Sequence, residues 1–499
     1  MSSQQIIVLI ILIVYLVANT VIGLVYGKVR DSRSNLSKEN KYFIGGRGMN
    51  GLILAMTTMA TYTSVSSFVS GPGAAGMTYG YAQAWVAATQ VPVTFLVLGV
   101  LGNKMAIVSR RTGAVTVAGY LRARYKSDLL VIVTSILMVV FFIVQMIGQF
   151  KGGATLVSVI TGLDYSVGLL IFAAVVIVYT SFGGFTAVVI TDTIQGLIMC
   201  LGTAILLFSA LAAGGGVTNI NAELAVKLPE VWDNLTGVYS PGSLLSFWIL
   251  VGFGTIGLPQ TAVRAMGFKN TKSLHNAMWI GAVTCAFVIV GMHLAGVWCG
   301  ALVDTSTLPN SDYFIPTVVL QIMPVGIAGL FLAAPLAAVM STVSSLLILA
   351  SAAIIKDIYH TYYVKDDPAR LAKYQKNLGK FTIGGTLLVG IVTVLLALNP
   401  PDIIWVLNLF AMGGLECAFF WPLVGGIFFK KGTKQGAVAA SIGGVAFYIF
   451  AYYNLKVLGI NAVVWGLLVS AILYYVVSFA TCPKEGLDKD VLEIGRAHV

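Results

Sequence analysis

The chain has 499 residues, of which 58% are hydrophobic and only 10% are charged, and its mean hydropathy is +0.91. An ordinary soluble domain carries about 25% charged residues, so this composition excludes a soluble enzyme, a secreted disulfide scaffold, a disordered tail protein and an outer-membrane barrel. The net charge of +11 indicates basic loops held against an anionic cytoplasmic leaflet rather than a nucleic-acid partner.

Long apolar runs predict an all-α integral membrane protein with about thirteen transmembrane helices. A membrane helix needs about 20 apolar residues, and such runs recur along the chain between charged residues or clusters of Gly, Pro and Asn. The predicted spans are 5–26, 50–71, 83–103, 128–150, 165–181, 185–213, 243–263, 276–303, 313–355, 379–398, 402–428, 434–453 and 459–481. The ninth is long enough to contain a short re-entrant or surface helix before a full span.

The charges between these spans predict the orientation of the chain. If the N-terminus lies outside, the inside segments carry 27 of the 30 Lys and Arg residues, and only Lys151, Lys227 and Lys456 fall outside. Because basic residues favour cytoplasmic loops, we expect the N-terminus outside the cytoplasmic membrane and the C-terminus in the cytoplasm.

The second span is rich in hydroxyl groups and ends near helix breakers. Eight of the eleven residues in 57–67 are Ser, Thr or Tyr, and the Gly71–Pro72–Gly73 run follows. We interpret this stretch as an unwound segment whose carbonyls and hydroxyls bind an ion and a substrate. The alternative is that the hydroxyls bond to carbonyls of their own helix.

Later spans carry isolated polar residues that are costly in hydrocarbon unless they face a cavity or a partner. The residues expected to border a central cavity are Gln83, Gln90, Gln145, Gln149 and Lys151. Gln145 and Gln149 are four residues apart and therefore share a helix face. Asp192 is predicted to be an ion-coupled carboxylate, with a helix-packing hydrogen bond as the alternative.

The seventh span repeats the interruption of the second. Within 251–264 it contains three glycines and Pro259, which removes an amide donor and disfavours the preceding helical turn. Broken helices five spans apart indicate a secondary transporter built from two inverted repeats.

A single membrane transport domain over 1–482 follows from this organisation. We expect an extra N-terminal helix (5–26), a first repeat (50–213), a second repeat (243–428), two C-terminal helices (434–481) and a cytoplasmic tail (483–499). The last seven residues, 493–499, match the translation of a common sequencing adapter, which indicates an artefact.

The ninth span supplies further hydroxyls at Ser341, Thr342, Ser344 and Ser345, and positions 341, 344 and 345 share one face. Neutral hydroxyls and backbone carbonyls suit a monovalent cation such as sodium, whereas magnesium or calcium calls for more carboxylates. The other acid inside a span, Glu416, and the lone histidine of the eighth span are both interpreted as structural.

Several blocks of sequence resemble the sodium/solute symporter family and, within it, the branch that transports pantothenate. The family signature is carried by 176–196, where a Gly183–Gly184 pair precedes Asp192. Further blocks lie at 42–49, 60–75, 256–264, 330–342, 354–359 and 413–426, so the resemblance runs from about residue 5 to residue 480.

The resemblance implies a sodium site between the second and ninth spans. Its ligands would be the carbonyls of Ala60, Thr63 and Ala338 and the hydroxyls of Ser341 and Thr342. A second sodium, present in some family members, would map to Asp192, Ser344 and Ser345. Proline-transporting relatives carry an aspartate where this chain has Tyr62. This difference argues against proline as the substrate of this chain.

The sequence therefore predicts sodium-coupled symport of pantothenate, a small anion, by alternating access. Sodium is the coupling ion, and neither a cofactor, an enzymatic activity nor a protein partner is implied. The predicted substrate contacts are Thr61, Ser64, Ser67, Gln145, Gln149 and Phe253. Arg264 and Lys151 are expected near the membrane faces, so the substrate carboxylate is expected to meet backbone amides at the broken helices. The alternative is sodium symport of another small solute, such as an amino acid or a short carboxylate.

Overall fold

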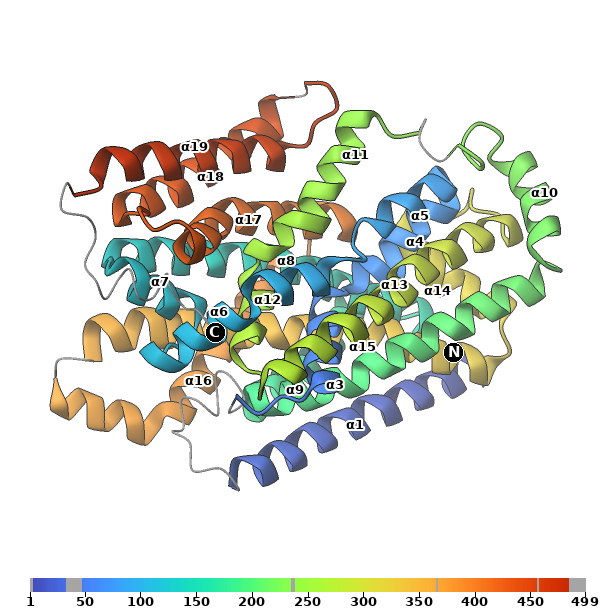
Figure 1. The fold of residues 1–499 in the computed structure, drawn as a ribbon. Coiled ribbons are helices and arrows are strands. Elements are labelled where there is room, and N and C mark those ends of the chain that lie inside the picture. The colour runs from blue at the N-terminus through green and yellow to red at the C-terminus, as the bar shows by residue number, and fades with distance from the viewer. Residues whose placement is uncertain (1–2, 33–46, 235–237, 365–366, 456, 484–499) are drawn as a thin grey trace.

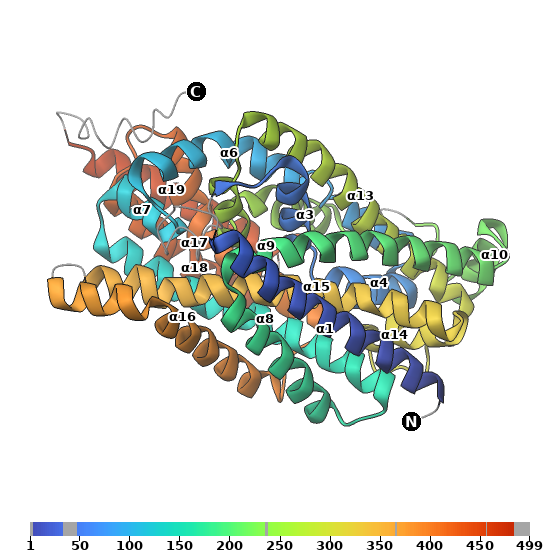
Figure 2. The same cartoon turned by 90° about the horizontal axis from the view of Figure 1, so that it is seen from below.

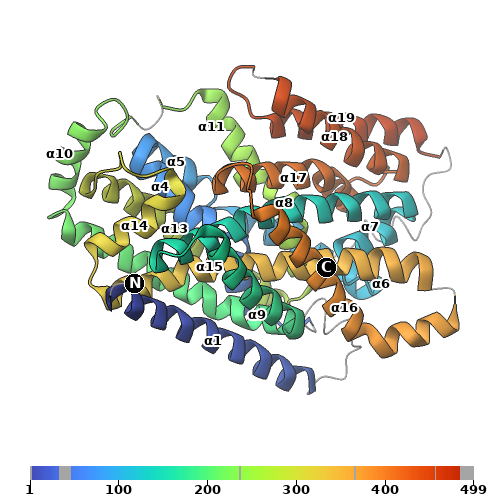
Figure 3. The same cartoon turned by 180° about the vertical axis from the view of Figure 1, so that it is seen from behind.

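The computed structural model describes residues 3–32, 47–234, 238–364, 367–455 and 457–483, and this part of the chain is helical, without a β-strand (Figure 1). The helices pack side by side. Helix α1 (Ser3–Ser32) lies along one flank, and α18 (Lys434–Asn454) with α19 (Ala462–Thr481) lies along the opposite flank (Figures 1 and 3). Residues 42–46 of one family-like block and most of the predicted tail lie outside the described residues.

Between these flanks the chain forms helices of very different lengths, in which η marks π-helical and 3-10 segments. In chain order they are α3 (Gly51–Tyr62), η2 (Ser66–Ser70), α4 (Gly71–Ala74), η3 (Ala75–Tyr79), α5 (Tyr81–Ala88), α6 (Val93–Thr112), α7 (Val117–Tyr125), α8 (Asp128–Thr161), α9 (Tyr165–Ala213), α10 (Val217–Lys227), α11 (Pro241–Phe247), η4 (Trp248–Gly252), η5 (Phe253–Gly257), α12 (Pro259–Ala262), η6 (Val263–Met266), α13 (Thr271–Leu302), α14 (Ser311–Ile322), α15 (Val325–Ala352), η7 (Ala353–Val364), α16 (Pro368–Ala397) and α17 (Ile404–Phe428).

Ten helices of the described residues are long and apolar enough to cross a membrane, or up to twelve if each of two bent pairs counts as one span. Many of their exposed side chains are large and hydrophobic, for example Ile10 and Val14 on α1 and Val476 and Phe479 on α19. The chain is therefore a multi-pass, all-α membrane protein, as the apolar runs predicted.

Helix α9 is 49 residues long and is broken near its middle. A straight helix of that length would extend about 74 Å, more than twice the hydrocarbon core of about 30 Å. The break is at Gly184, whose φ of 65° and ψ of 179° suit glycine rather than a residue with a side chain. Figure 2 shows the two parts running in different directions from the break. The break falls between the predicted spans 165–181 and 185–213.

The second and seventh predicted spans are both interrupted. Helix α3 ends at Tyr62, and the segment Ser66–Tyr79 continues at an angle of 73° to it. The break lies within the hydroxyl-rich stretch, while the Gly–Pro–Gly run that follows stays helical as α4. The second interruption is at Leu258, which has an extended backbone and precedes Pro259 at the start of α12, and the helices meet there at 48°.

The predicted span 313–355 divides into the short helix α14 and the long helix α15 ahead of Pro324, in line with the expectation of a short helix before a full span. Other boundaries differ from the prediction, for local reasons. Helix α16 begins at Pro368 rather than at 379, because the carboxylate of Asp367 accepts hydrogen bonds from two free amides of its first turn, at 2.9 and 3.1 Å. The short helix α10 was not predicted from hydropathy, since it is only 11 residues long.

Candidate functional site

The C-terminal end of α3 meets the middle of α15 at the centre of the molecule. The hydroxyl of Ser341 donates to the carbonyl oxygens of Ala60 at 2.8 Å and Ala338 at 3.1 Å. The hydroxyl of Thr342 donates to the carbonyl oxygen of Thr61 at 3.5 Å. Because α3 ends one residue later, these last carbonyls lack the amide partners of a continuing helix. They are available to a hydroxyl donor or to a cation.

Four of the five predicted sodium ligands thus lie together, and the fifth, Thr63, is the residue that caps α3. Its amide donates to the carbonyl oxygen of Met59 at 2.8 Å, and its backbone is extended. All of these residues are buried. A buried set of neutral carbonyl and hydroxyl oxygens, with no carboxylate among them, suits a monovalent hard cation better than a divalent one.

Next to this oxygen set is a fully buried ion pair between Asp192 on α9 and Arg264 on η6. The Nη2 atom of Arg264 lies 3.0 Å from Oδ2 of Asp192, and both side chains have an exposed fraction of 0%. The same Nη2 donates to the hydroxyl of Ser345 at 2.8 Å, and Nη1 donates to the carbonyl of Gln260 at 2.7 Å. The hydroxyl of Thr57 donates to Oδ2 of Asp192 at 2.8 Å.

This arrangement corrects the expectation that Arg264 lies near a membrane face. The guanidinium reaches back from the end of the seventh span into the core, where it contacts two of the three residues predicted to bind a second sodium, Asp192 and Ser345. The third, Ser344, donates to the carbonyl of Ser341 at 3.2 Å. Lys151 lies in the C-terminal third of α8 and forms an ion pair with Asp312 at 2.8 Å. Its side chain is 12% exposed.

The unwound stretch after α3 is supported by Gln149 on α8. The Oε1 atom of Gln149 accepts a hydrogen bond from the amide of Val65 at 3.1 Å, deep in the protein. Without this acceptor, a backbone amide at the break would be buried with no partner, which costs about 1–3 kcal/mol.

We therefore expect Gln149→Leu to destabilise the protein by about 1–3 kcal/mol, because leucine fills the space but accepts no hydrogen bond. The measurement is thermal unfolding of the purified protein in detergent. The matched control is Gln375→Leu, the same substitution at an exposed position of α16. Equal stability of the two variants would contradict the role given to Gln149.

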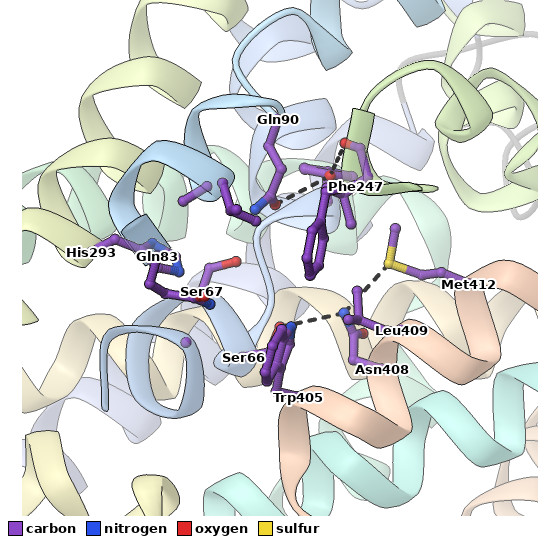
Figure 4. Close-up of a pocket in the computed structure, with 15 residues that line it drawn as sticks. Ser66, Ser67, Gln83, Gln90, Phe247, His293, Trp405, Asn408, Leu409 and Met412 are labelled. Atoms are coloured by element: carbon purple, nitrogen blue, oxygen red, sulfur yellow. Dashed lines mark hydrogen bonds between the residues drawn. The ribbon is translucent and has the colours of Figure 1, made fainter. Parts of the chain in front are cut away.

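A pocket lies beside the break, enclosed by the second span, α5 and the turn after it, α11 with η4, α13 and α17 (Figure 4). Its lining residues are Tyr62, Ser66, Ser67, Gly71, Gln83, Val86, Ala87, Gln90, Phe247, Val251, His293, Trp405, Asn408, Leu409 and Met412. None of these described residues is an acid, a lysine or an arginine. The groups that the pocket offers to a ligand are therefore amides, hydroxyls, one imidazole and aromatic faces.

Hydrogen bonds tie the polar groups of the pocket to its walls. The hydroxyl of Tyr62 donates to the carbonyl of Val251 at 2.7 Å and to the side chain of Gln90 at 3.2 Å, and so bridges the second and seventh spans. Asn408 donates to the hydroxyl of Ser66 at 3.3 Å and accepts from Gln145 at 3.0 Å. Figure 4 marks the hydrogen bond between Asn408 and Ser66 with a dashed line.

An imidazole and two stacked rings complete the lining. The Nδ1 atom of His293 lies 2.8 Å from the carbonyl of Ile289, and since a carbonyl only accepts, Nδ1 carries the proton. Its Nε2 approaches Gly71, where a Cβ atom would lie only 2.5 Å from it. The rings of Phe247 and Trp405 stack at 6.2 Å and 10°.

Only some of the predicted substrate contacts lie at the pocket. Ser67 lines the pocket, Ser64 hydrogen-bonds Ser66 at 2.7 Å, and Gln145 reaches the pocket only through Asn408. Thr61 contacts Asp192 and Ser345, and Gln149 supports the break. Phe253 lies away from the pocket, 53% exposed and packed on Phe420.

The contribution of α17 was missed by the sequence analysis. Trp405, Asn408, Leu409 and Met412 follow the spacing of one helix face. Asn408 is a polar residue on that face, and it could have marked the helix as pocket-lining.

Three comparisons relate the chain to known proteins. Residues 42–444 match the model of the sodium:solute symporter family. The chain is 43% identical to the sodium/pantothenate symporter of Haemophilus influenzae over 89% of this chain and 90% of that protein. It is 42% identical to the sodium/pantothenate symporter of Escherichia coli, over 95% of this chain and 96% of that protein.

Among solved structures, the fold resembles a Na⁺-coupled sialic acid symporter in a substrate-bound, outward-open state. The TM-score is 0.75 at 19% identity, and the match covers 96% of this chain and 99% of that one. The nucleobase-cation-symport transporter Mhp1 in a closed conformation matches with a TM-score of 0.54 at 15% identity, over 93% of this chain and 100% of that one. At these identities the likeness concerns the fold alone.

Proposed function

The chain belongs to the sodium:solute symporter family, and on that premise we propose that it carries pantothenate into the cell together with sodium. Relatives that are 42–43% identical over most of this chain are sodium/pantothenate symporters. The observation that supports the coupling is that the last carbonyl oxygens of α3 contact the hydroxyls of Ser341 and Thr342 on α15.

The proposed topology has thirteen crossings, with the N-terminus outside and the C-terminus cytoplasmic. It counts each bent pair once and the two parts of α9 separately. The core consists of two inverted repeats of five crossings, 50–213 and 243–428. Their first members are the two broken spans, as expected for a transporter with a central binding site.

Alternating access follows from a sodium ion held between α3 and α15. The ion replaces the direct hydrogen bonds of Ser341 and Thr342 with coordination to the same oxygens, and so stabilises the arrangement of the break that shapes the pocket. A ligand shifts a conformational equilibrium only by its difference in affinity for the two states. Separation of α3 from α15 in the inward-open state would dismantle the site and release both sodium and cargo.

We propose one sodium ion per cycle. Oδ2 of Asp192 and the hydroxyl of Ser345 are already engaged by the guanidinium of Arg264. The arginine thus supplies, within the protein, the positive charge that a second sodium would bring. Since pantothenate carries one negative charge, one sodium and one cargo molecule together are electrically neutral.

The pocket offers partners for each part of the cargo. Amide and hydroxyl groups of Gln83, Gln90 and Ser67 suit its amide and hydroxyls, and the stacked rings of Phe247 and Trp405 suit its gem-dimethyl group. No lysine or arginine lines the described pocket, so the carboxylate depends on amide donors or on the nearby sodium.

We expect purified protein in liposomes to take up labelled pantothenate with an inward sodium gradient but not with an inward choline gradient. Unlabelled pantothenate should compete for uptake, while proline should not. Equal uptake in choline would contradict the sodium coupling, and competition by other solutes alone would contradict the cargo.

A further inference from the structure

Glu416 extends the pocket-lining face of α17 into the protein interior. It follows Asn408 and Met412 at intervals of four residues, so it lies on the same face of the helix, one turn beyond the pocket. Its exposed fraction is 0%, and neither carboxyl oxygen has a hydrogen-bond partner within the described residues. No described lysine or arginine forms an ion pair with it.

The carboxyl group sits against the break in the seventh span. A Cβ atom at Gly254 would lie 2.3 Å from Oε2 of Glu416 and 2.7 Å from the carbonyl oxygen of Ile249. The absent side chain of Gly254 therefore leaves the space that the carboxyl group fills. Gly252, two residues earlier, has a non-helical backbone with φ of −107° and ψ of −88°.

The titratable groups around Glu416 are all uncharged when protonated. Tyr62 on α3 and Tyr448 on α18 interact electrostatically with it, and Cys417 is its neighbour on α17. No cation balances an ionised carboxylate at this place, and a buried carboxylate without a partner is strongly unfavourable. The group must therefore bind a proton or a metal cation.

A proton fits this place better than sodium does. Sodium needs several oxygen ligands around it, and Glu416 lines neither the pocket beside the break nor the neighbouring cavity between α11, α17 and α18. A proton requires no such space, and the carboxylic acid it forms is the neutral species that the apolar surroundings favour.

We propose that Glu416 is a proton-binding site one helical turn beyond the substrate pocket and that one proton crosses the membrane with each cargo molecule. The inference rests on the proposed function, because it takes the cargo to be an anion. When the site opens to the outside, a hydronium ion transfers its proton to the Glu416 carboxylate, so that an O–H bond forms and a water molecule is left. When the broken seventh span moves in the inward-open state, water reaches the acid and removes the same proton.

The proton changes the electrical balance of transport. One sodium ion and one monovalent anion carry no net charge, whereas adding a proton gives one positive charge per cycle. A membrane potential of 100 mV, negative inside, then raises the attainable accumulation about 50-fold, the equivalent of about 2.3 kcal/mol. Without the proton, the potential has no effect on the accumulation.

The experiment measures pantothenate accumulation in proteoliposomes at a fixed inward sodium gradient. A potassium diffusion potential set with valinomycin is varied between zero and about −100 mV, and the external pH is varied separately. We expect the potential and external acid each to increase accumulation by the wild-type protein at least several-fold. Glu416→Gln, which mimics the protonated acid, should keep sodium-driven uptake and lose both effects. The matched control Glu223→Gln, at an exposed acid of α10, should behave like the wild type.

Each other outcome is decisive. If sodium-driven uptake by the wild type depends on neither the membrane potential nor the external pH, Glu416 is not a proton-coupling site. The proposed function is not affected by that result. A potential effect that persists in Glu416→Gln also overturns the proton site, because the charge is then carried by a second sodium. If the variant does not fold, the wild type is tested alone: external alkalinisation of about one proton per cargo is expected, and its absence overturns the proposal. Acid-driven uptake without any sodium dependence would support Glu416 and contradict the sodium coupling.

Discussion

Substituting glutamine for Arg264 is expected to destabilise the protein by about 3–5 kcal/mol, because it leaves the carboxylate of Asp192 buried without its cation. Both side chains are fully buried, and the guanidinium is the only described cation paired with that carboxylate. The measurement is thermal unfolding in detergent, together with the yield of folded protein.

A double-mutant cycle separates the ion pair from other contacts of Arg264. Asp192→Asn combined with Arg264→Gln should destabilise the protein by clearly less than the sum of the single changes, since no charge is then left unpaired. Arg370→Gln is the matched control. It removes an arginine from a pair with Asp367 whose side chains are 47% and 42% exposed, and such surface pairs contribute about 0–1 kcal/mol. Additive effects in the cycle would contradict the coupling.

Replacing Ser341 with alanine is expected to raise the sodium concentration for half-maximal uptake about 10- to 150-fold. This range corresponds to the loss of one contact to a charged group, about 1.5–3 kcal/mol. Thr342→Ala should act in the same direction, and Thr342→Ser, which keeps the hydroxyl, should restore most of the sodium affinity. Uptake is measured as a function of sodium at saturating cargo.

Ser351→Ala provides the control on the same helix. Its hydroxyl is also buried and donates to a backbone carbonyl, that of Thr382 at 3.1 Å, but it lies away from the end of α3. We expect its sodium dependence to match that of the wild type. If Ser341→Ala and Thr342→Ala also match the wild type, the sodium site does not lie between α3 and α15.

Two buried acids of the core, Asp192 and Glu416, differ in how their charge is neutralised. Asp192 is neutralised by Arg264 within the protein, so it holds the second, sixth, seventh and ninth spans together in the absence of any bound ion. Glu416 has no such partner and, as we propose, takes its positive charge from solution. A buried acid with an internal cation stabilises one structure, whereas a buried acid without one couples structure to the external medium.

Local features of the sequence predicted the membrane class, the helices and both broken spans. These features are encoded by residues close together in the chain: apolar runs of sufficient length, Gly184 at the break in α9, and Pro259 after Leu258. The clustering of Ser341 and Thr342 with the second span was implied by family resemblance, and the structure brings these residues to the end of α3.

What the sequence could not reveal depends on contacts between residues far apart in the chain. Arg264 was expected at a membrane face because it ends the seventh span, yet it pairs with Asp192, 72 residues away. Phe253 was expected to contact the substrate, but it packs on Phe420 outside the pocket. The aromatic and apolar wall of the pocket is instead formed partly by one face of α17.

The sequence by itself thus determined that the protein is a multi-pass helical membrane protein with interrupted helices, because hydropathy and helix breaking are local properties. Only the tertiary structure decided which polar groups neutralise one another and which remain unpaired. That outcome depends on the packing of helices such as α3, α9 and α17, which determines whether a buried acid such as Asp192 or Glu416 lies beside a cation.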